Sequence, residues 1–147
     1  MRDMTQEQKE LLLKDLCARL PYGVWVKDIH TNIIRKLSNI VVHPLYDGNN
    51  IKDYICSIKM FDDHYVDIEY IRPFLYPFSC MTDEQKKEYT HIVNYISSDD
   101  TGNWKEGEFI YVEQLDQLMH FYHKNHLDYK GLIEKGLAID CTNLNIY

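Results

Sequence analysis

Residues 64–89, HYVDIEYIRPFLYPFSCMTDEQKKEY, join two halves of different character. Short β-type runs precede this stretch, and a helical periodicity follows it. Pro73 and Pro77 fix φ and remove two backbone donors, so we expect a rigid corner that does not continue as a central strand. Thr82 then opens a capping box, T-D-E-Q, in which Gln85 can reach back to the Thr82 amide. The stretch therefore predicts an α+β fold, with strands before the corner and helices after it.

A helix is expected near the amino terminus. Thr5-Gln6-Glu7-Gln8 is a second capping box. Pro21 disfavours helical geometry for the residue before it, and Gly23 permits a sharp exit from the helix. These signals predict a helix over residues 5–19. Its apolar face, at i, i+3 and i+4 spacing, consists of Leu12, Leu13, Leu16, Cys17 and Leu20.

The region 22–72 carries the signals of short antiparallel strands. The β-type runs cover 22–29, 32–43, 51–61 and 64–68, and polar residues within the second run favour a turn or bulge there. Pro44–Asn50 contains an Asp47-Gly48 turn signal and is expected to be a loop. Asp67 can cap a single helical turn after the last run. Alternate positions of the third run are half-buried candidates: Tyr54, Cys56, Ile58 and Met60. The short links leave no room for parallel crossovers, so we predict a small SH3-like barrel or a curled sheet.

The second half, 82–135, is predicted to be helical. A helix over 82–97 is expected to bury Tyr89, Ile92, Val93 and Ile96. A polar loop over 98–107 follows, and then a mainly helical segment, 109–126, with Leu115, Leu118, Met119 and Tyr122 on its apolar face. A turn of helix over 129–135 is expected to end at Gly136 in the C-cap position. The extended tail 137–147 could dock as an edge strand of the same single domain, 1–147.

Composition narrows the class of protein. The chain has 147 residues, a net charge of −7 and no long basic cluster, so duplex nucleic acid is a poor candidate partner. The four cysteines are far apart and include no C-x-x-C pair, which favours reduced thiols in a cytosol over a zinc site. No apolar run approaches the roughly 20 residues of a membrane span. We therefore expect a soluble cytoplasmic protein that has no membrane partner.

Four residues are candidates for binding. Arg72 is a cation on the rigid corner; it could hold a carboxylate or phosphate, although pairing with Asp67 or Glu69 is favoured. Trp104, in the polar loop, could stack on a base or a partner side chain, or fold back over the core. Tyr129 and Lys130 lie in a segment that resembles no phosphate-binding loop, but they supply an aromatic ring and a cation.

The histidine-rich segment carries a candidate metal site. Glu113, Asp116, His120 and His123 share one face of the 109–126 helix on a 100° wheel. Their spacing is not H-E-x-x-H, and any solvated amphipathic helix shows such a face. We predict a solvated polar face, no metal and no cofactor. The chain also has no G-x-S-x-G and no phosphate-loop motif, so we expect no catalytic residues and no enzymatic activity.

Three stretches resemble a family of uncharacterised small proteins from phages, prophages and mobile elements of gut bacteria. They are MTQEQKELLLKDLCARLPYGVWV, VDIEYIRPFLYPFSCMTDEQKKEY and LDYKGLIEKGLAIDCTNLNIY, about half of the chain. The resemblance departs most in 30–62 and 98–111. It implies a bacterial cytoplasm as the setting and carries no activity with it.

The sequence thus favours a non-enzymatic accessory protein that binds a host protein or forms a homo-oligomer. Its twelve tyrosines suit a half-buried, aromatic-rich contact surface, although β-strands also favour tyrosine. The alternative is a small-molecule binder that sequesters a nucleotide defence signal.

Overall fold

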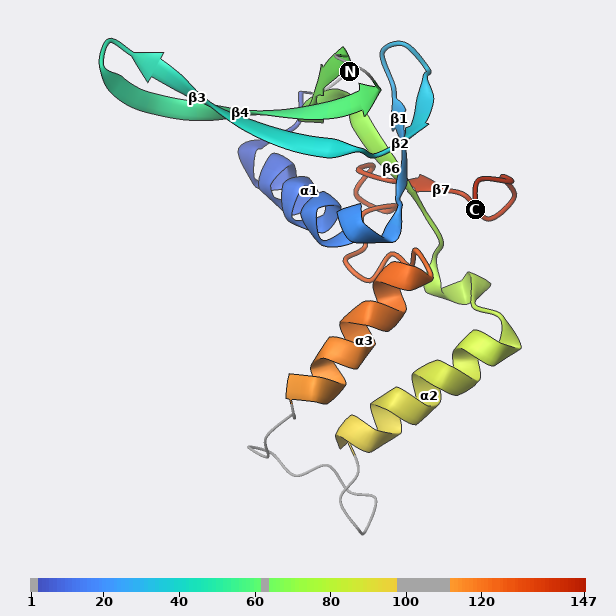
Figure 1. Ribbon diagram of the computed structural model, residues 1–147. Helices are drawn as coiled ribbons and strands as arrows, with labels where there is room; N and C mark the ends of the chain where they lie inside the picture. Colours follow the sequence, from blue (N-terminus) through green and yellow to red (C-terminus); the bar gives the residue numbers. More distant parts are fainter. Residues whose placement is uncertain (1–2, 62–63, 98–111) are drawn as a thin grey trace.

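The computed structural model describes residues 3–61, 64–97 and 112–147. Its helices and strands, in chain order, are α1 (Gln6–Arg19), β1 (Trp25–Asp28), β2 (Ile34–Lys36), β3 (Asn39–Asp47), β4 (Asn50–Phe61), β5 (His64–Asp67), β6 (Ile71–Leu75), α2 (Asp83–Ser97), α3 (Val112–Lys124) and β7 (Ile139–Asp140). Figure 1 shows three parts: a body in which α1 lies beside the strands, a helical hairpin of α2 and α3 below it, and a long ribbon of β3 and β4 that projects from the body. The fold is α+β, as predicted.

The strands form two sheets that stay open within the described residues. One has the order β2-β1-β6-β7 and the other β3-β4-β5. The chain passes between them at Leu37, whose N–H donates to the Val24 carbonyl (2.8 Å). It returns through the predicted single helical turn, a 3₁₀ turn that the Asp67 carboxylate caps at Glu69. The curled-sheet alternative is therefore correct, and the closed barrel is not.

α1 begins as predicted but faces the core differently. Gln8 N–H donates to Thr5 Oγ1 (3.2 Å) and Thr5 N–H donates to Gln8 Oε1 (3.0 Å), which completes the capping box. Its buried residues are Leu12, Asp15, Leu16 and Arg19, whereas Cys17 is exposed. The predicted apolar stripe is wrong for Cys17, because a buried ion pair occupies part of the inward face.

The expected loop at Pro44–Asn50 is wrong. β3 continues to Asp47, and β4 starts at Asn50, directly opposite Asp47 in the register. Gly48 has φ 63°, the left-handed conformation that two-residue hairpin turns require at their first position. The Asp-Gly signal thus marks a tight hairpin within one long ribbon.

Pro73 was expected to exclude a central strand, and this is also wrong. β6 contains Pro73 and lies between β1 and β7. Ile29 N–H donates to the Tyr70 carbonyl (2.8 Å), so this pair of β1 and β6 is hydrogen-bonded. Hydrogen-bonded and non-hydrogen-bonded pairs alternate along antiparallel strands, and the Val26–Pro73 pair, three positions further, is therefore non-hydrogen-bonded. The Pro73 nitrogen therefore faces β7, which pairs only from Phe74 onwards. The strand tolerates proline because no neighbour needs its missing N–H.

In the helical half, α2 begins where it was predicted to begin, but the buried side chains of α3 differ in part from the predicted ones. The second capping box forms between Thr82 and Gln85 (2.8 and 3.1 Å). On α3, Leu115 is 45% exposed while Phe121 is fully buried, so the apolar face is shifted from the predicted one. Residues 129–135 form successive turns and no helix, although Gly136 has the left-handed φ of a C-cap (72°). The predicted tail docks as the short edge strand β7, parallel to β6.

The described residues bury two apolar clusters. The body cluster joins α1 to the strands through Leu12, Leu16, Val24, Val26, Ile58, Ile71 and Leu75. The hairpin cluster joins α2 to α3 through Ile92, Phe121, Tyr122 and Leu127, with Tyr76, Phe78, Tyr89 and Tyr129 packed against them. Ile92 and Tyr89 thus lie inward as predicted. The chain segments after β6 and after α3 connect the two clusters.

Candidate protein interaction surface

The Arg72 side chain hydrogen-bonds backbone carbonyls and so has a structural role. Its Nε donates to the Gly136 carbonyl (3.0 Å), and its Nη1 donates to the carbonyls of Glu69 (2.8 Å) and Ile71 (2.9 Å). The predicted partner was a carboxylate, but the Glu69 carboxylate lies 3.8 Å from Lys9 Nζ instead. Burial lowers the pKa of the Arg72 guanidinium. Arg72 therefore fastens the segment before β7 to β6.

Tyr129 and Lys130 lie together at the edge of the hairpin cluster. The Tyr129 ring stacks on Tyr122, with 4.8 Å between ring centroids, and its hydroxyl hydrogen-bonds His123 Nε2 (2.9 Å). Lys130 Nζ lies 5.6 Å from the same ring, and Arg19 lies 5.4 Å from it. Trp104 lies outside the described residues. The sequence-predicted residues therefore do not form one common site in the part of the chain that the structure describes.

The solvated histidine face was only partly correct. His120 is exposed and contacts Tyr22 (2.8 Å from Nδ1 to the hydroxyl), but His123 is only 7% exposed. Burial, and then the charge of Arg19, lower the His123 pKa. Among the described residues, no group of three or more His, Cys, Asp or Glu side chains could hold a metal ion.

A buried polar cluster at the junction of α1 and α3 was not predicted. Arg19 Nε donates to Asp15 Oδ2 (2.8 Å) and Arg19 Nη2 donates to the Leu127 carbonyl (2.6 Å), with both side chains fully buried. The i, i+4 spacing of Asp15 and Arg19 within the leucine stripe was the available signal. Nothing in the sequence indicated the third partner, 108 residues away.

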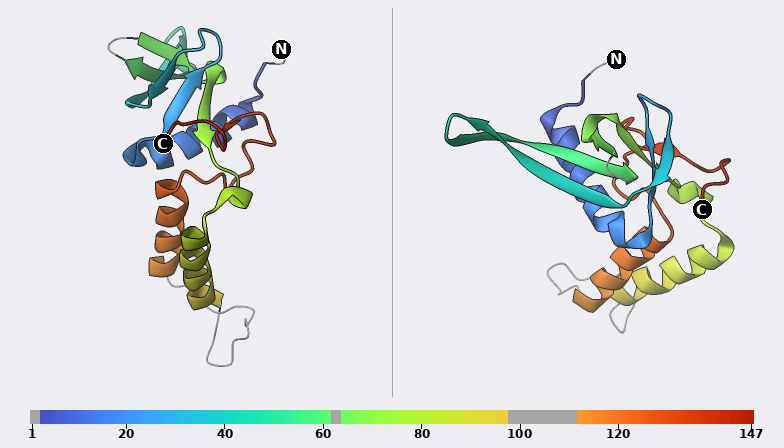
Figure 2. Two further views of the ribbon diagram at one scale, coloured as in Figure 1. Left: turned by 90° about the vertical axis from the view of Figure 1, so that its right-hand side faces the viewer. Right: turned by 45° about the horizontal axis from the view of Figure 1, so that its top comes forward.

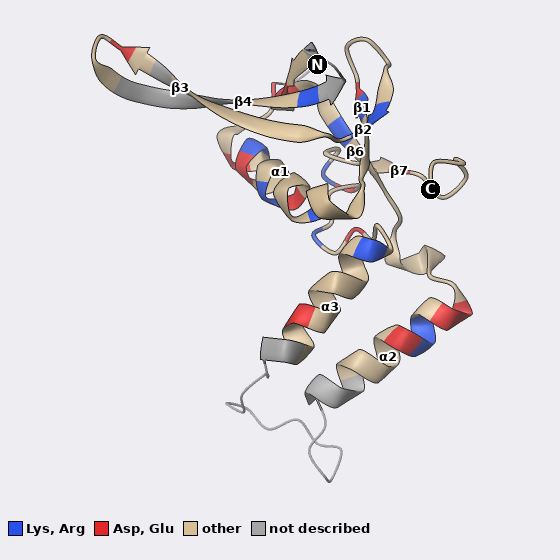
Figure 3. Ribbon diagram, in the orientation of Figure 1, with Lys and Arg blue, Asp and Glu red and all other residues tan. Residues whose placement is uncertain are grey.

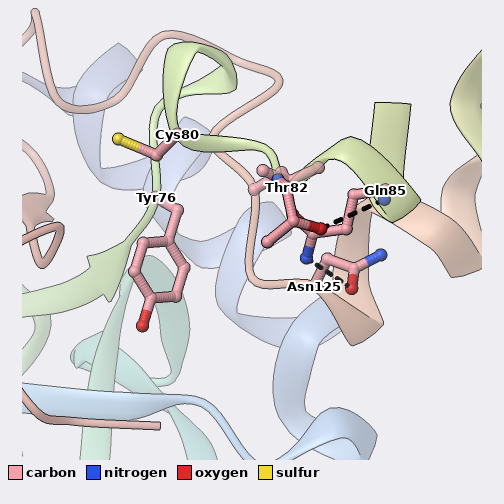
Figure 4. A pocket seen from close by; sticks show the side chains of 6 residues that line it. Tyr76, Cys80, Thr82, Gln85 and Asn125 are labelled. Carbon is pink, nitrogen blue, oxygen red and sulfur yellow. Dashed lines mark hydrogen bonds between the residues drawn. The ribbon is translucent and has the colours of Figure 1, made fainter. Parts of the chain in front are cut away.

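Three clefts among the described residues are candidate ligand sites. The cleft in Figure 4 has a volume of about 260 Å³, and Tyr76, Cys80, Thr82, Gln85, Asn125 and Leu127 line it. Its amide groups are already used, since Gln85 donates to Asn125 (3.0 Å) and Asn125 donates to the Phe121 carbonyl (2.9 Å). Its wall carries no cation to compensate a phosphate.

The other two clefts offer no better nucleotide site. One, of about 380 Å³, has two lysines and one imidazole ring; its lining residues are Lys86, Lys87, Thr90 and His91. The other, of about 250 Å³, has aromatic and acidic walls; among its lining residues are Asp28, His30, Tyr65, Asp67 and Tyr70. None of the three places a phenylalanine, tyrosine or tryptophan ring beside two basic side chains.

The ribbon of β3 and β4 carries Tyr46 and Val42, the two most exposed large apolar side chains among the described residues. β5 pairs with β4 only between Ser57 and Phe61, so within the described residues the segment 42–56, which we name the arm, pairs with no third strand. Figures 1 and 2 show the arm extending away from the body as a twisted two-stranded ribbon. Isolated two-stranded hairpins are only marginally stable in water, so an arm of this kind benefits from a cover.

One face of this ribbon runs from the body core to the arm tip. Ile40, Val42, Pro44 and Tyr46 alternate onto one side of β3, and their register partners on β4 are Ile58, Cys56, Tyr54 and Ile51. We name the side chains of Ile40, Val42, Pro44, Tyr46 and Ile58 the arm face. It begins in the core, where Ile58 is fully buried, and becomes exposed outward: Val42 is 49% and Tyr46 63% exposed. Figure 3 shows β3 without charge for most of its length.

The outer edge of β3 is poorly suited to pairing with a further strand. Pro44 has no N–H to donate, so it occupies a non-hydrogen-bonded position opposite β4. Val42 and Ile40, two and four residues earlier on β3, have the same orientation, so their N–H groups point away from β4. The Ile40 N–H is satisfied by Asn39 Oδ1 (2.8 Å). Proline and self-satisfied amides are the features with which proteins protect exposed edges. The arm face is therefore better suited to a protein contact than the β3 edge is to strand addition.

No family model, curated protein or solved structure matches this chain. The resemblance to proteins of phages and mobile elements therefore stays a prediction. No helix in the described part of the chain has the length and apolarity to cross a membrane.

Proposed function

We propose that this chain is a non-enzymatic accessory protein that binds another protein through the arm face. The supporting observation is a strip of apolar side chains that starts in the core at Ile58 and ends exposed at Tyr46. Exposed apolar patches of this kind mark interaction sites in soluble proteins. Tyrosine contributes strongly to such contacts because its ring is large and loses little conformational entropy.

The sequence resemblance supplies the proposed setting, which is the cytoplasm of a bacterial host during phage infection or lysogeny. The partner is then a host protein or a second copy of the chain. The nucleotide-sequestering alternative has less support, because none of the three described clefts places a phenylalanine, tyrosine or tryptophan ring beside two basic side chains.

Site-specific photo-crosslinking in bacterial cells tests the proposal. A photoreactive phenylalanine analogue placed at Tyr46 is expected to give a covalent adduct with a second protein chain. The matched control is Leu115 on α3, which is also exposed (45%) but distant from the arm in Figure 1. Equal adducts from both positions, or none from position 46, would contradict the proposal. Thermal stabilisation by a nucleotide, about 2.7 kcal/mol at 100-fold excess over its Kd, would instead support the alternative.

A further inference from the structure

We propose that internal water completes the buried polar cluster between α1 and the segment after α3. This site involves no residue of the arm face and goes beyond the proposed function. Its basis is a set of buried polar atoms that no protein atom satisfies. Among the described residues, four buried side-chain oxygen or nitrogen atoms have no hydrogen-bond partner, and three of them belong to Asp15, Arg19 and His126.

These three residues meet at one junction. Arg19 Nε donates to Asp15 Oδ2 (2.8 Å), and Arg19 Nη2 donates to the carbonyl of Leu127, the residue that follows His126 (2.6 Å). The charge of Arg19 contributes to the lowered pKa of His126, which is consistent with an imidazole near the guanidinium. The unsatisfied atoms, Asp15 Oδ1, Arg19 Nη1 and His126 Nδ1, therefore belong to one place in the fold and are not scattered through the interior.

Existing contacts keep these side chains from satisfying one another. Asp15 and Arg19 are both 0% exposed, and a buried charged group that lacks hydrogen bonds is costly. Arg19 is held by its two hydrogen bonds, and the His126 ring is held by its stack on Tyr147, with 3.6 Å between centroids. A rotation toward a new protein partner would break these contacts. Buried polar groups that no protein atom reaches are commonly satisfied by ordered water.

The chemistry of the three atoms selects water over an ion. The Asp15 carboxylate oxygen only accepts, the Arg19 N–H only donates, and a neutral His126 accepts at Nδ1 when Nε2 carries the proton. An anion at this junction would be repelled by Asp15, and a cation would be repelled by Arg19. Water is neutral, both donates and accepts, and needs a cavity of only about 10–15 Å³. Since a buried water makes about three hydrogen bonds, one or two molecules suffice.

A high-resolution crystal structure of the full chain is the first test, and it needs no substitution. We expect water oxygens within about 2.7–3.2 Å of Arg19 Nη1 and of Asp15 Oδ1. Direct protein partners for both atoms, an ion in place of water, or a junction without solvent density would each overturn the proposal.

Magnetic relaxation dispersion of water oxygen-17 is the second test, because it counts long-lived internal waters in solution. The Asp15→Leu, Arg19→Met double variant should hold at least one such water fewer than the wild type, since its apolar side chains offer no hydrogen bonds. The matched control is Lys124→Met, which removes a charge from an exposed ion pair with Glu88 and should leave the count unchanged. Circular dichroism verifies that both variants fold. Equal counts in the wild type and a folded double variant would contradict the proposal.

Discussion

Arg19 connects parts of the molecule that are distant in sequence. Its guanidinium bonds Asp15 on α1 and the Leu127 carbonyl after α3, and it lies over the Tyr129 ring. Asp15 Oδ1 and Arg19 Nη1 have no hydrogen-bond partner among the protein atoms, although both are buried. A buried ion pair contributes little net stability, but breaking it leaves an uncompensated charge in the interior.

We therefore expect Arg19→Met to lower the free energy of unfolding by about 3–5 kcal/mol. The Asp15→Leu, Arg19→Met double variant should recover much of this loss, because no charge is then left buried. Urea unfolding of the three proteins measures both effects. The control is Lys124→Met, which removes an exposed pair with Glu88 (2.6 Å) and should cost less than about 1 kcal/mol. A double variant as unstable as the single one would argue against this account.

His126 is held in an unusual environment. Its backbone has φ 55°, its ring stacks on Tyr147 with 3.6 Å between centroids, and its Nδ1 is buried without a hydrogen-bond partner. Burial, followed by the charges of Arg19 and Lys36, lowers the pKa of His126 from 6.5 to about 4. The folded protein thus favours the neutral imidazole.

Stability should consequently depend on pH. Between pH 6.5 and about 4, His126 is protonated in the unfolded chain but neutral in the folded chain. The free energy of unfolding is therefore highest above this range and decreases as the pH falls through it. Partial solvent exposure limits the effect to about 1–2 kcal/mol. His126→Asn should flatten the dependence, because asparagine tolerates a positive φ and does not titrate. Urea midpoints across this range test the prediction, and identical slopes for both proteins would refute it.

At the scale of elements, β3 shows how one residue controls an exposed strand. Pro44 removes an outward N–H in the middle of the edge, and Asn39 occupies another. The hairpin can therefore be long, with nine residues in β3 and twelve in β4, without offering a complete row of donors.

Replacing Pro44 should allow the β3 edge to pair with a strand of another molecule. Pro44→Thr restores the missing N–H while keeping a residue that favours strands, so we expect assemblies larger than those of the wild type. Light scattering at increasing concentration is the measurement. His43→Thr, on the neighbouring position, introduces the same side chain without adding a donor and should not change the scattering. Indistinguishable behaviour of both variants would show that Pro44 does not protect the edge.

In the whole molecule, Tyr147 is one of several residues that link the body to the helical hairpin. Its hydroxyl accepts the Trp25 N–H of β1 (3.1 Å) and donates to the Phe74 carbonyl of β6 (2.8 Å). Its ring stacks on His126, directly after α3. Burial raises the pKa of the Tyr147 hydroxyl, so it stays protonated and able to donate. One tyrosine thereby ties two strands of the body to the end of the hairpin.

Tyr147→Phe should destabilise the protein by about 1–2 kcal/mol, since the Trp25 N–H and the Phe74 carbonyl lose their partner. Tyr147→Ala should cost more, because the stack on His126 is lost as well. Amide hydrogen exchange at Trp25 provides a local measurement and should accelerate in both variants. Tyr65→Phe, at an exposed tyrosine, is the control. Unchanged protection of Trp25 in Tyr147→Phe would contradict the assignment.

The sequence by itself determined the features that depend on neighbouring residues. Both capping boxes, at Thr5 and Thr82, join groups three residues apart, and the helical turn after Asp67 is equally local. The alternation of Tyr54, Cys56 and Ile58 predicted the strand that became β4. Such signals are readable because the interacting groups lie within one turn or one pleat of each other.

Tertiary structure decided what depends on partners far along the chain. Pro73 could enter a central strand only because β7, arriving after both helices, begins pairing beyond it. Asp15 and Arg19 could be buried only because the Leu127 carbonyl lies beside them. The arm face is exposed because the ribbon of β3 and β4 extends beyond the body, past the last β5 pairing at Ser57 (Figure 1). In each case the register and length of a distant strand or turn set the outcome, and no local propensity encodes these quantities.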